Sequence, residues 1–217
     1  MASQTEIRAR RTLFITSLVG FMVAMEITII SIARNQISAA FPDAEAATLS
    51  WVITAYNIGV ASLLLPAGWM ADRYGRKKVF LWGLGAFIFG SLLSGVASTP
   101  SLLIGARVVQ SVGGAAQYPA GLALLLAAFP IENRMRAIGV WGAVSGLAAA
   151  LAPSLGALLI EGFGWRAVFL INVPVALLAL IAGRSWLGES TGDEVSERVD
   201  LVSVPLASLG IGALLIG

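Results

Sequence analysis

One acidic residue, Glu26, lies deep within the first of several long apolar runs in this sequence. An ionisable group at such a depth in a membrane span costs about 2.5–3.5 kcal/mol on insertion scales, and it usually faces a cavity or a partner. A carboxyl group in apolar surroundings can load and release a proton near neutral pH. We therefore interpret Glu26 as a proton- or cation-handling residue. The alternative is a structural glutamate that is hydrogen-bonded within a helix bundle.

The fourth apolar run carries a second polar line, formed by Arg107, Gln110, Gly114 and Gln117. Residues three or four apart are neighbours on one side of a helix, so these four share a face. We predict that this face lines a proton or substrate pathway with Glu26, and that Asn57 of the second run belongs to the same pathway. Arg107 could instead snorkel to the membrane surface. The spacing alone does not establish that Glu26 and Arg107 interact.

A short basic turn separates the second and third apolar runs. Four cations fall within six residues, at positions 73, 76, 77 and 78, and Asp72 comes just before them. Loops this rich in Lys and Arg stay on the cytoplasmic side of a membrane. The turn therefore fixes one point of the topology, from which the other spans are counted.

The fifth apolar run has small residues at helical spacing. They are Gly142, Gly146, Ala150, Pro153 and Ala157, with Gly156 beside the last. Small residues at this spacing let two helices approach closely, and Pro153 removes one helix hydrogen bond and permits a bend. Spacing alone does not separate a gating element from an ordinary packing seam.

Composition places the elements that carry these residues in a membrane. The chain is 58% hydrophobic and 12% charged, with a mean hydropathy of +0.87, whereas soluble domains are about 25% charged. An apolar run of about 20 residues crosses a bilayer as a helix. Six such runs are predicted, at residues 12–33, 49–71, 79–97, 102–129, 137–160 and 168–182. The first run is longer than the apolar core of a signal peptide and contains Glu26.

The predicted fold is an all-α membrane protein, a six-helix transmembrane bundle with the start of a seventh helix. Its parts are a cytoplasmic N-terminal arm at 1–11, the bundle at 12–183, a charged cytoplasmic linker at 184–200 and an incomplete seventh span at 201–217. All but three of the 14 cations fall in segments predicted to be cytoplasmic, and the six tryptophans lie near span ends. Both patterns predict a multi-pass protein of the inner (plasma) membrane with a cytoplasmic N-terminus.

The same composition argues against several classes of function. The sequence has no histidine and no cysteine, which removes disulfides, thiol metal sites and the usual general base. We therefore expect no enzyme activity, no metal and no cofactor. The net charge is only +2, and the cations gather at span ends rather than on one face, so a nucleic-acid partner is not expected.

The basic turn resembles the G-x-x-x-D-R-x-G-R-K signature between the second and third spans of the major facilitator superfamily. The match holds at Gly68, Asp72, Arg73, Gly75, Arg76 and Lys77. The resemblance implies that Asp72 and the nearby arginines latch the cytoplasmic side against an opposite bundle, so these six residues are predicted to form a gating loop.

Further stretches resemble the 14-span drug:proton antiporter branch of that superfamily. Residues 26–31 resemble the end of its first span, with Glu26 and Ser31 where the branch usually has Asp and Asn. Residues 107–114, followed by Pro119, resemble its fourth-span motif, and residues 165–174 resemble its sixth span. Its fifth-span antiporter motif is predicted at Gly142, Gly146, Pro153 and Gly156.

The resemblance covers essentially the whole chain, which has only half the family's length. Family members pack two six-span bundles around a midplane site and alternate its exposure by rocking. The resemblance therefore implies the N-terminal half of a proton-coupled exporter of drugs or other small amphipathic compounds. Its expected partners are a small-molecule substrate, protons, the lipid bilayer and a second copy or complementary half.

Two questions stay open at the level of sequence. The chain reads equally as a fragment, a truncated gene or a half-transporter, and a non-transporting or partner-dependent membrane subunit is the alternative function. The polar face that bears Glu26 and Arg107 is expected to look across a cavity at a second bundle, and to meet lipid if the chain is alone.

Overall fold

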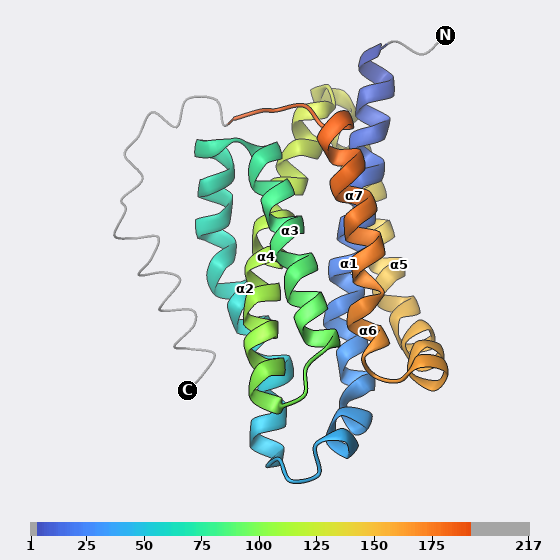
Figure 1. The fold of residues 1–217 in the computed structure, drawn as a ribbon. Helices are drawn as coiled ribbons and strands as arrows, with labels where there is room; N and C mark the ends of the chain where they lie inside the picture. The colour runs from blue at the N-terminus through green and yellow to red at the C-terminus, as the bar shows by residue number, and fades with distance from the viewer. Residues whose placement is uncertain (1–3, 192–217) are drawn as a thin grey trace.

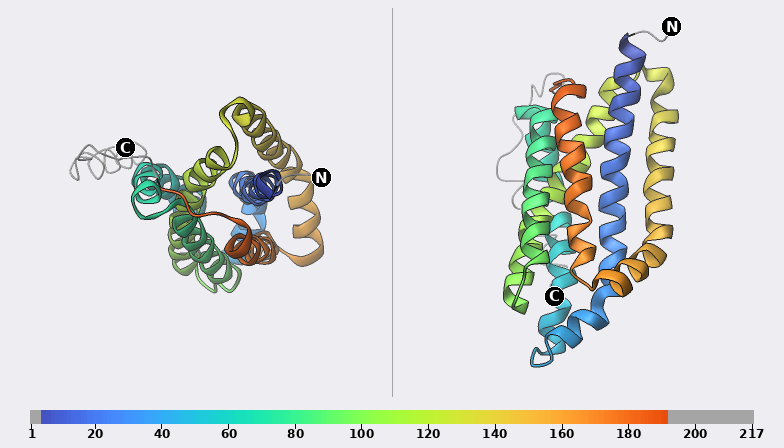
Figure 2. Two further views of the ribbon diagram at one scale, coloured as in Figure 1. Left: turned by 90° about the horizontal axis from the view of Figure 1, so that it is seen from above. Right: turned by 45° about the vertical axis from the view of Figure 1, so that its right-hand side comes forward.

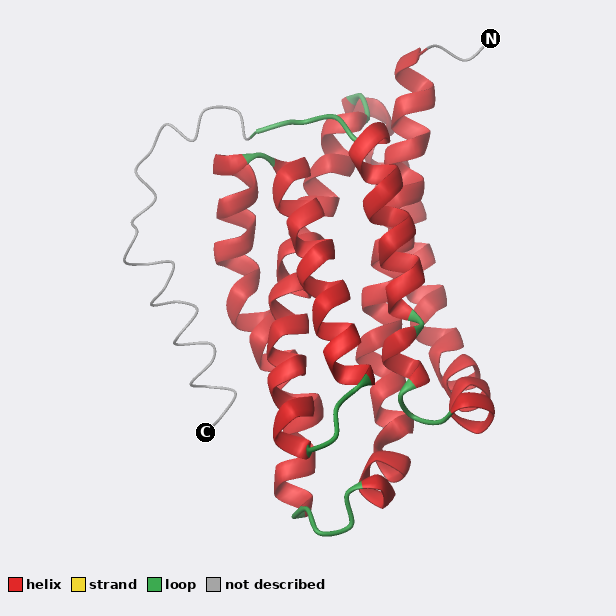
Figure 3. Ribbon diagram, viewed as in Figure 1, coloured by secondary structure: helices red, strands yellow, loops and turns green. Residues whose placement is uncertain are grey.

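The computed structural model describes residues 4–191. The predicted seventh span at 201–217 and most of the predicted linker at 184–200 lie outside the described residues. Within them the chain is helical, without a strand (Figures 1 and 3). The helices are α1 (Gln4–Ala40), α2 (Ala46–Tyr74), α3 (Arg76–Gly95), α4 (Pro100–Ala128), α5 (Ile131–Phe163), α6 (Ala167–Leu170) and α7 (Asn172–Trp186).

The predicted six-helix bundle is confirmed. Five helices, together with the combined segment Ala167–Trp186, are long and apolar enough to cross a membrane, by length and composition among the described residues. A helix satisfies its own backbone hydrogen bonds, which a lipid environment requires. The sixth span consists of α6 and α7, and Ile171 between them keeps helical dihedral angles (φ −62°, ψ −27°). The two helices therefore continue as one segment of membrane-spanning length.

The predicted N-terminal arm is helical from Gln4 onward. Residues 4–11 are not a separate segment but the first turns of α1. No glycine or proline separates the arm from the apolar run, and the arginines there are good helix formers. The helix therefore starts before the apolar segment does.

Two tight connections are set by local chemistry. Gly75 joins α2 to α3 with φ 108°, a conformation that a side chain would strain. At the opposite end of the bundle, the Thr99 hydroxyl accepts a hydrogen bond from the backbone N–H of Leu102 at 3.2 Å and caps α4, with Pro100 at the first turn. The threonine cap and the proline after it are typical helix start signals.

The helices surround α1 and α4. Viewed from above, α1 lies near the middle, with α5 on one side and α7 on another (Figure 2). Helix α1 packs along α5, while α2 and α3 both pack along α4. A Cβ atom added at Gly90 or Gly113 would collide with backbone atoms of the facing helix, so α3 and α4 approach closely. Helices α2 and α5 are the least buried spans.

Most of the described cations lie together at one end of the bundle, which we call the basic end. It is the end where α1 begins and where the α2–α3 and α4–α5 connections lie (Figure 1). Ten cations of the described chain lie there: Arg8, Arg10, Arg11, Arg73, Arg76, Lys77, Lys78, Arg134, Arg136 and Arg184. Arg34 and Arg166 lie toward the opposite end, and Arg107 lies between the two ends.

Two large apolar clusters fill most of the interior, and a small third one consists of Leu125, Ala137 and Trp141. The large cluster nearer the basic end includes Val19, Phe80 and Leu124, and the other large one includes Ile37 and Leu103. Four helices, α1, α3, α4 and α7, also carry buried polar side chains, at positions between the residues of the two large clusters along the chain. We call them the polar layer; they are Glu26, Ser91, Arg107, Gln110 and Asn172.

Candidate functional site

The centre of the polar layer is an ion pair between Glu26 of α1 and Arg107 of α4. Arg107 Nη1 donates to Glu26 Oε1. The Arg107 side chain is 0% exposed and the Glu26 side chain is 1% exposed. Sequence reasoning left this interaction open and expected the two groups to face a cavity. The structure corrects that expectation, because both charges are enclosed within the bundle.

Arg107 is held by two further groups. Its Nη1 also donates to Gln110 Oε1 at 2.6 Å, and its Nε donates to the Val52 carbonyl at 3.0 Å. The guanidinium Cζ lies 4.2 Å from the centre of the Tyr56 ring and 5.5 Å from that of Phe169. Aromatic faces attract a cation most strongly where water is excluded.

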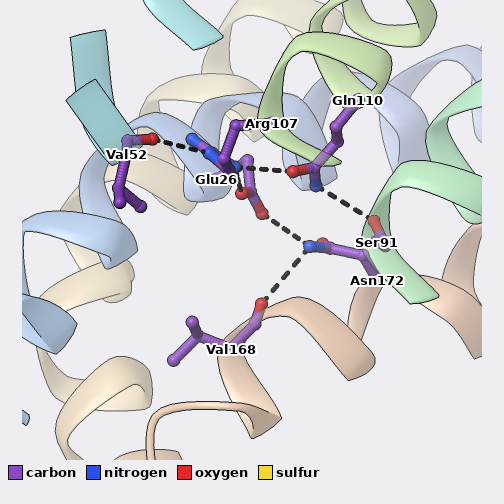
Figure 4. A network of polar contacts seen from close by, with 7 residues as sticks. All are labelled: Glu26, Val52, Ser91, Arg107, Gln110, Val168 and Asn172. Carbon is purple, nitrogen blue, oxygen red and sulfur yellow. Dashed lines mark hydrogen bonds and ion pairs between the residues drawn. The ribbon is translucent and has the colours of Figure 1, made fainter. Parts of the chain in front are cut away.

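Two residues of the network were not predicted from the sequence. Asn172 Nδ2 donates to Glu26 Oε2 at 2.5 Å and to the Val168 carbonyl at 3.3 Å, and Gln110 Nε2 donates to Ser91 Oγ at 3.0 Å (Figure 4). Asn172 could have been found as a polar side chain inside the predicted sixth span. Ser91 carries no such signal, since serine is common in apolar runs.

The pairing explains how charges persist in this interior. A lone buried charge is very costly, whereas a pair with additional hydrogen bonds offsets much of the desolvation. Removing one partner of such a pair typically costs about 3–5 kcal/mol. The guanidinium cannot lose its proton, so the carboxyl of Glu26 is the member of the pair that can change charge.

Three predicted pathway residues lie outside this hydrogen-bond network. Gln117 is fully buried on α4, and its side-chain amide has no hydrogen-bond partner within residues 4–191. Gly114 makes room for Tyr56, whose hydroxyl would lie 2.9 Å from a Cβ at that position. Asn57 is exposed on the outer face of α2, because its neighbour Tyr56 occupies the inward position. The structure does not bring Asn57 to the ion pair.

The predicted gating loop forms a compact turn at the basic end. Arg76, the first residue of α3, forms an ion pair with Asp72 of α2 at 2.8 Å. The exposed Arg73 places its guanidinium carbon 5.7 Å from the centre of the Trp69 ring. Lys77 Nζ donates to the Arg184 carbonyl at 2.8 Å. The turn is thereby attached to the end of α7. A Cβ at Gly68 would be in ordinary contact with Pro119 of α4.

The small-residue seam of α5 faces outward rather than into the bundle. No atom of the described chain lies within 4 Å of a Cβ placed at Gly142 or Gly146, and Pro153 is exposed. Gly156 is the exception, since a Cβ there would meet Ile29 of α1 at 2.7 Å. The predicted close helix approach therefore occurs at Gly156, where α5 contacts α1.

No group of three or more Asp, Glu, His or Cys side chains that could hold a metal occurs in the described part of the chain. The chemistry of the site is instead that of a carboxylate, a guanidinium and neutral amides. Such a set can bind or release a proton and can rearrange its hydrogen bonds as it does so.

The sequence profile of the Major Facilitator Superfamily matches residues 11–214. The chain belongs to the Major Facilitator Superfamily. The predicted resemblance is therefore confirmed, and the six apolar helices are those of a multi-pass membrane protein of this superfamily.

Similar members of the superfamily are resistance and efflux proteins. Multidrug resistance protein Stp of Mycobacterium tuberculosis (strain CDC 1551 / Oshkosh) is 36% identical over 204 residues, which is 94% of this chain and 38% of that protein. Methylenomycin A resistance protein of Streptomyces coelicolor is 37% identical over 197 residues, covering 90% and 40%. The chain spans about two fifths of the length of these relatives.

Two solved structures of POT transporters share the fold. The POT family transporter PepTSo aligns with a TM-score of 0.75 at 13% identity, covering 95% of this chain and 52% of that one. A peptide transporter POT in complex with sulfate aligns with a TM-score of 0.74 at 14% identity, covering 100% of this chain and 49% of that one. At this identity the likeness concerns the fold alone.

Proposed function

We propose that this superfamily member is one six-helix bundle of a proton-coupled exporter of drugs or other small amphipathic compounds. The observation that carries the proposal is the buried ion pair between Glu26 and Arg107, the one place in the described interior where an acid and a base meet. The names of its relatives support the class of substrate.

The proton and Arg107 compete for the same carboxylate. While Glu26 is ionised, the pair is neutral overall and its charges are compensated. When Glu26 takes up a proton, Arg107 keeps its charge in a layer enclosed by two apolar clusters. The loss of its counter-ion raises the free energy of this packing. Proton binding therefore favours another arrangement of the helices, in which Arg107 reaches water, a substrate or another partner.

The outward faces of α2 and α5 support the proposed second bundle. These helices are the least buried spans, and the Gly142–Gly146 seam lacks a neighbour among the described residues. A second copy or a complementary half would pack there, with residues 184–200 as the linker and 201–217 as the start of a further span. We place the basic end, with the Asp72–Arg76 gating turn, on the cytoplasmic side.

Export of a fluorescent cation tests this function. The chain is expressed in bacteria that lack their own exporters, and ethidium efflux is measured with and without a pH gradient. We expect gradient-dependent efflux from the wild-type chain where it assembles, and its loss in Glu26→Gln at equal membrane insertion. Equal gradient-dependent efflux by both would contradict the role of Glu26, and an absence of wild-type efflux despite assembly would contradict transport.

A further inference from the structure

The first residue of α7, Asn172, holds the second oxygen of Glu26. Its Nδ2 lies 2.5 Å from Glu26 Oε2 and 3.3 Å from the Val168 carbonyl, which belongs to α6. The side chain is buried. One amide nitrogen therefore bridges the ionisable group of α1 and the first turn of the sixth span, beside the junction of α6 and α7 at Ile171.

The bridge suits the ionised state of Glu26 better than the protonated state. A carboxylate and a backbone carbonyl are both acceptors, and the amide NH2 group donates to both. When a proton adds to Oε2, an O–H bond forms there and the oxygen becomes a donor. The hydroxyl oxygen is a weaker acceptor than the carboxylate, so the hydrogen bond from the amide weakens, and the new O–H has no acceptor unless the partner presents one.

Asn172 is the partner of Glu26 that can make this change. Arg107, the other partner, has five N–H donors and no acceptor. A side-chain amide has an oxygen on its other side, and a turn about its terminal bond exchanges the two groups. The turn would let Asn172 accept from protonated Glu26, and it would also withdraw the amide N–H from the Val168 carbonyl.

The other polar groups around the pair are already committed or do not contact Glu26. Gln110 uses its oxygen for Arg107 and its nitrogen for Ser91. Tyr56 of α2 places its ring against the Arg107 guanidinium, and its hydroxyl has no hydrogen-bond partner among residues 4–191. Arg107 and Tyr56 are thus the titratable groups that surround Glu26 in the polar layer.

We propose that Asn172 is a positioning residue whose amide turns when Glu26 is protonated, and so links the charge state of Glu26 to the junction of α6 and α7. This inference rests on the proposed proton role of Glu26. Release of the Val168 carbonyl removes a side-chain bond that ties α6 to α7. Proton uptake on α1 thereby changes the hydrogen bonding at the start of the sixth span.

Infrared difference spectroscopy of the whole chain in lipid nanodiscs tests the proposal without transport. The sequence has four asparagines, at positions 35, 57, 133 and 172. The first three are exposed, so replacing them with serine leaves Asn172 as the single isotope-labelled asparagine amide. Spectra are compared between high and low pH, and Glu26→Gln identifies the carboxyl band of Glu26.

We expect two signals on acidification. A protonated-carboxyl band of Glu26 appears, and the labelled amide carbonyl shifts to lower frequency because it begins to accept a hydrogen bond. In Asn172→Leu the amide signal is lost and the Glu26 band moves to higher frequency, since its carboxyl has lost a partner. Asn35→Leu, at an exposed site of α1, is the matched control and keeps the wild-type Glu26 band.

The outcomes separate this inference from the proposed function. An amide band that does not change while Glu26 is protonated overturns the role of Asn172 and leaves the proton role of Glu26 intact. The same conclusion follows if Asn172→Leu keeps the wild-type Glu26 band. A wild-type chain without any Glu26 band between pH 4 and pH 10 (roughly the span of ordinary carboxyl to amine titration) contradicts the proposed function itself. The measurement of the labelled amide band needs no substitution at position 172, so it tests the proposal even where Asn172→Leu fails to fold.

Discussion

The two members of the buried ion pair place unequal demands on the interior. A guanidinium keeps its charge at any accessible pH, whereas a carboxyl group can be neutralised by a proton. Loss of Glu26 leaves Arg107 charged among Tyr56, Phe169 and neutral amides. Loss of Arg107 leaves a carboxyl that can bind a proton and keep its hydrogen bond with Asn172 by the amide turn. The pair is therefore asymmetric in its consequences for stability.

This asymmetry predicts the order of stability in a set of variants. We expect Glu26→Leu to lower the free energy of unfolding by about 3–5 kcal/mol, as is typical when one partner of a buried pair is removed. Arg107→Leu should lower it by less. The double variant should recover part of the loss, because no charge is left unpaired. Unfolding in detergent, followed by circular dichroism, gives the three values. Equal losses in both single variants would contradict the argument.

The gating turn gives a second prediction for a single residue. The Asp72 side chain is 40% exposed, and exposed ion pairs contribute little to stability. Asp72→Asn should therefore leave the melting temperature and membrane insertion unchanged. Because the turn is proposed to gate the cytoplasmic side, the same variant should slow ethidium export several-fold in assembled transporter. Lys78→Gln, a charge removed in the same turn, serves as the control. Wild-type rates in Asp72→Asn would mean that the turn only orients the chain in the membrane.

At the scale of the helix, α5 presents two faces with opposite tolerance. Its inner face lies against α1 at Gly156, close to Ile29, while Gly142 faces open space within the described structure. A side chain on the inner face must displace packed atoms, and overpacking typically costs about 1–3 kcal/mol. A side chain on the outer face meets nothing in this bundle.

We therefore expect Gly156→Leu to lower the stability of the bundle by an amount in that range, and Gly142→Leu to leave it unchanged or slightly raised, since leucine favours a helix over glycine. The two variants match in chemistry and differ only in face. If a second bundle packs on the outer face, Gly142→Leu should still reduce export. Thermal unfolding and ethidium efflux, measured on the same preparations, distinguish stability from assembly.

At the scale of the whole molecule, most of the described cations lie at the basic end, where the α2–α3 and α4–α5 connections lie (Figure 1). Loops rich in Lys and Arg face the cytoplasm. The opposite end carries the α1–α2 loop with Glu45 and the α3–α4 turn with Ser98. This distribution predicts the orientation of all six spans at once.

Cysteine labelling checks that orientation, since the native chain has no cysteine. We expect Lys78→Cys and Asn133→Cys to react with an impermeant maleimide only from the cytoplasmic side, and Glu45→Cys and Ser98→Cys only from outside. Gly75 is avoided because its φ of 108° disfavours any side chain, and Thr99 because it caps α4. The reverse pattern would overturn the proposed topology.

The open faces of α2 and α5 predict how the chain behaves alone. A single bundle has no partner for the outer α5 seam, and small-residue seams favour close helix packing. We expect liposomes that hold single copies of the chain to show no ethidium uptake against a pH gradient, and uptake to require two copies or a complementary half. Robust uptake by single copies would refute the proposal that the chain is one bundle of a larger transporter.

The sequence by itself determined the class, the number of spans and the charged end. Each of these depends on information that is local along the chain, because bilayer thickness sets the length of an apolar run and basic residues mark loops. Helical spacing also placed Arg107 and Gln110 on one face, and the structure has both in the polar layer. The family signature was equally readable, since its residues lie within one short stretch.

Only the tertiary structure decided which faces meet. Close approach at Gly90 and Gly113 brings Gln110 against α3 and Ser91, and the inward turn of Tyr56 leaves Asn57 outside. The rotation of each helix about its axis depends on side-chain packing against several neighbours at once, which no single run of sequence encodes. For the same reason the pairing of Glu26 with Arg107, and the place of Asn172 beside them, emerged only when all the helices were packed together.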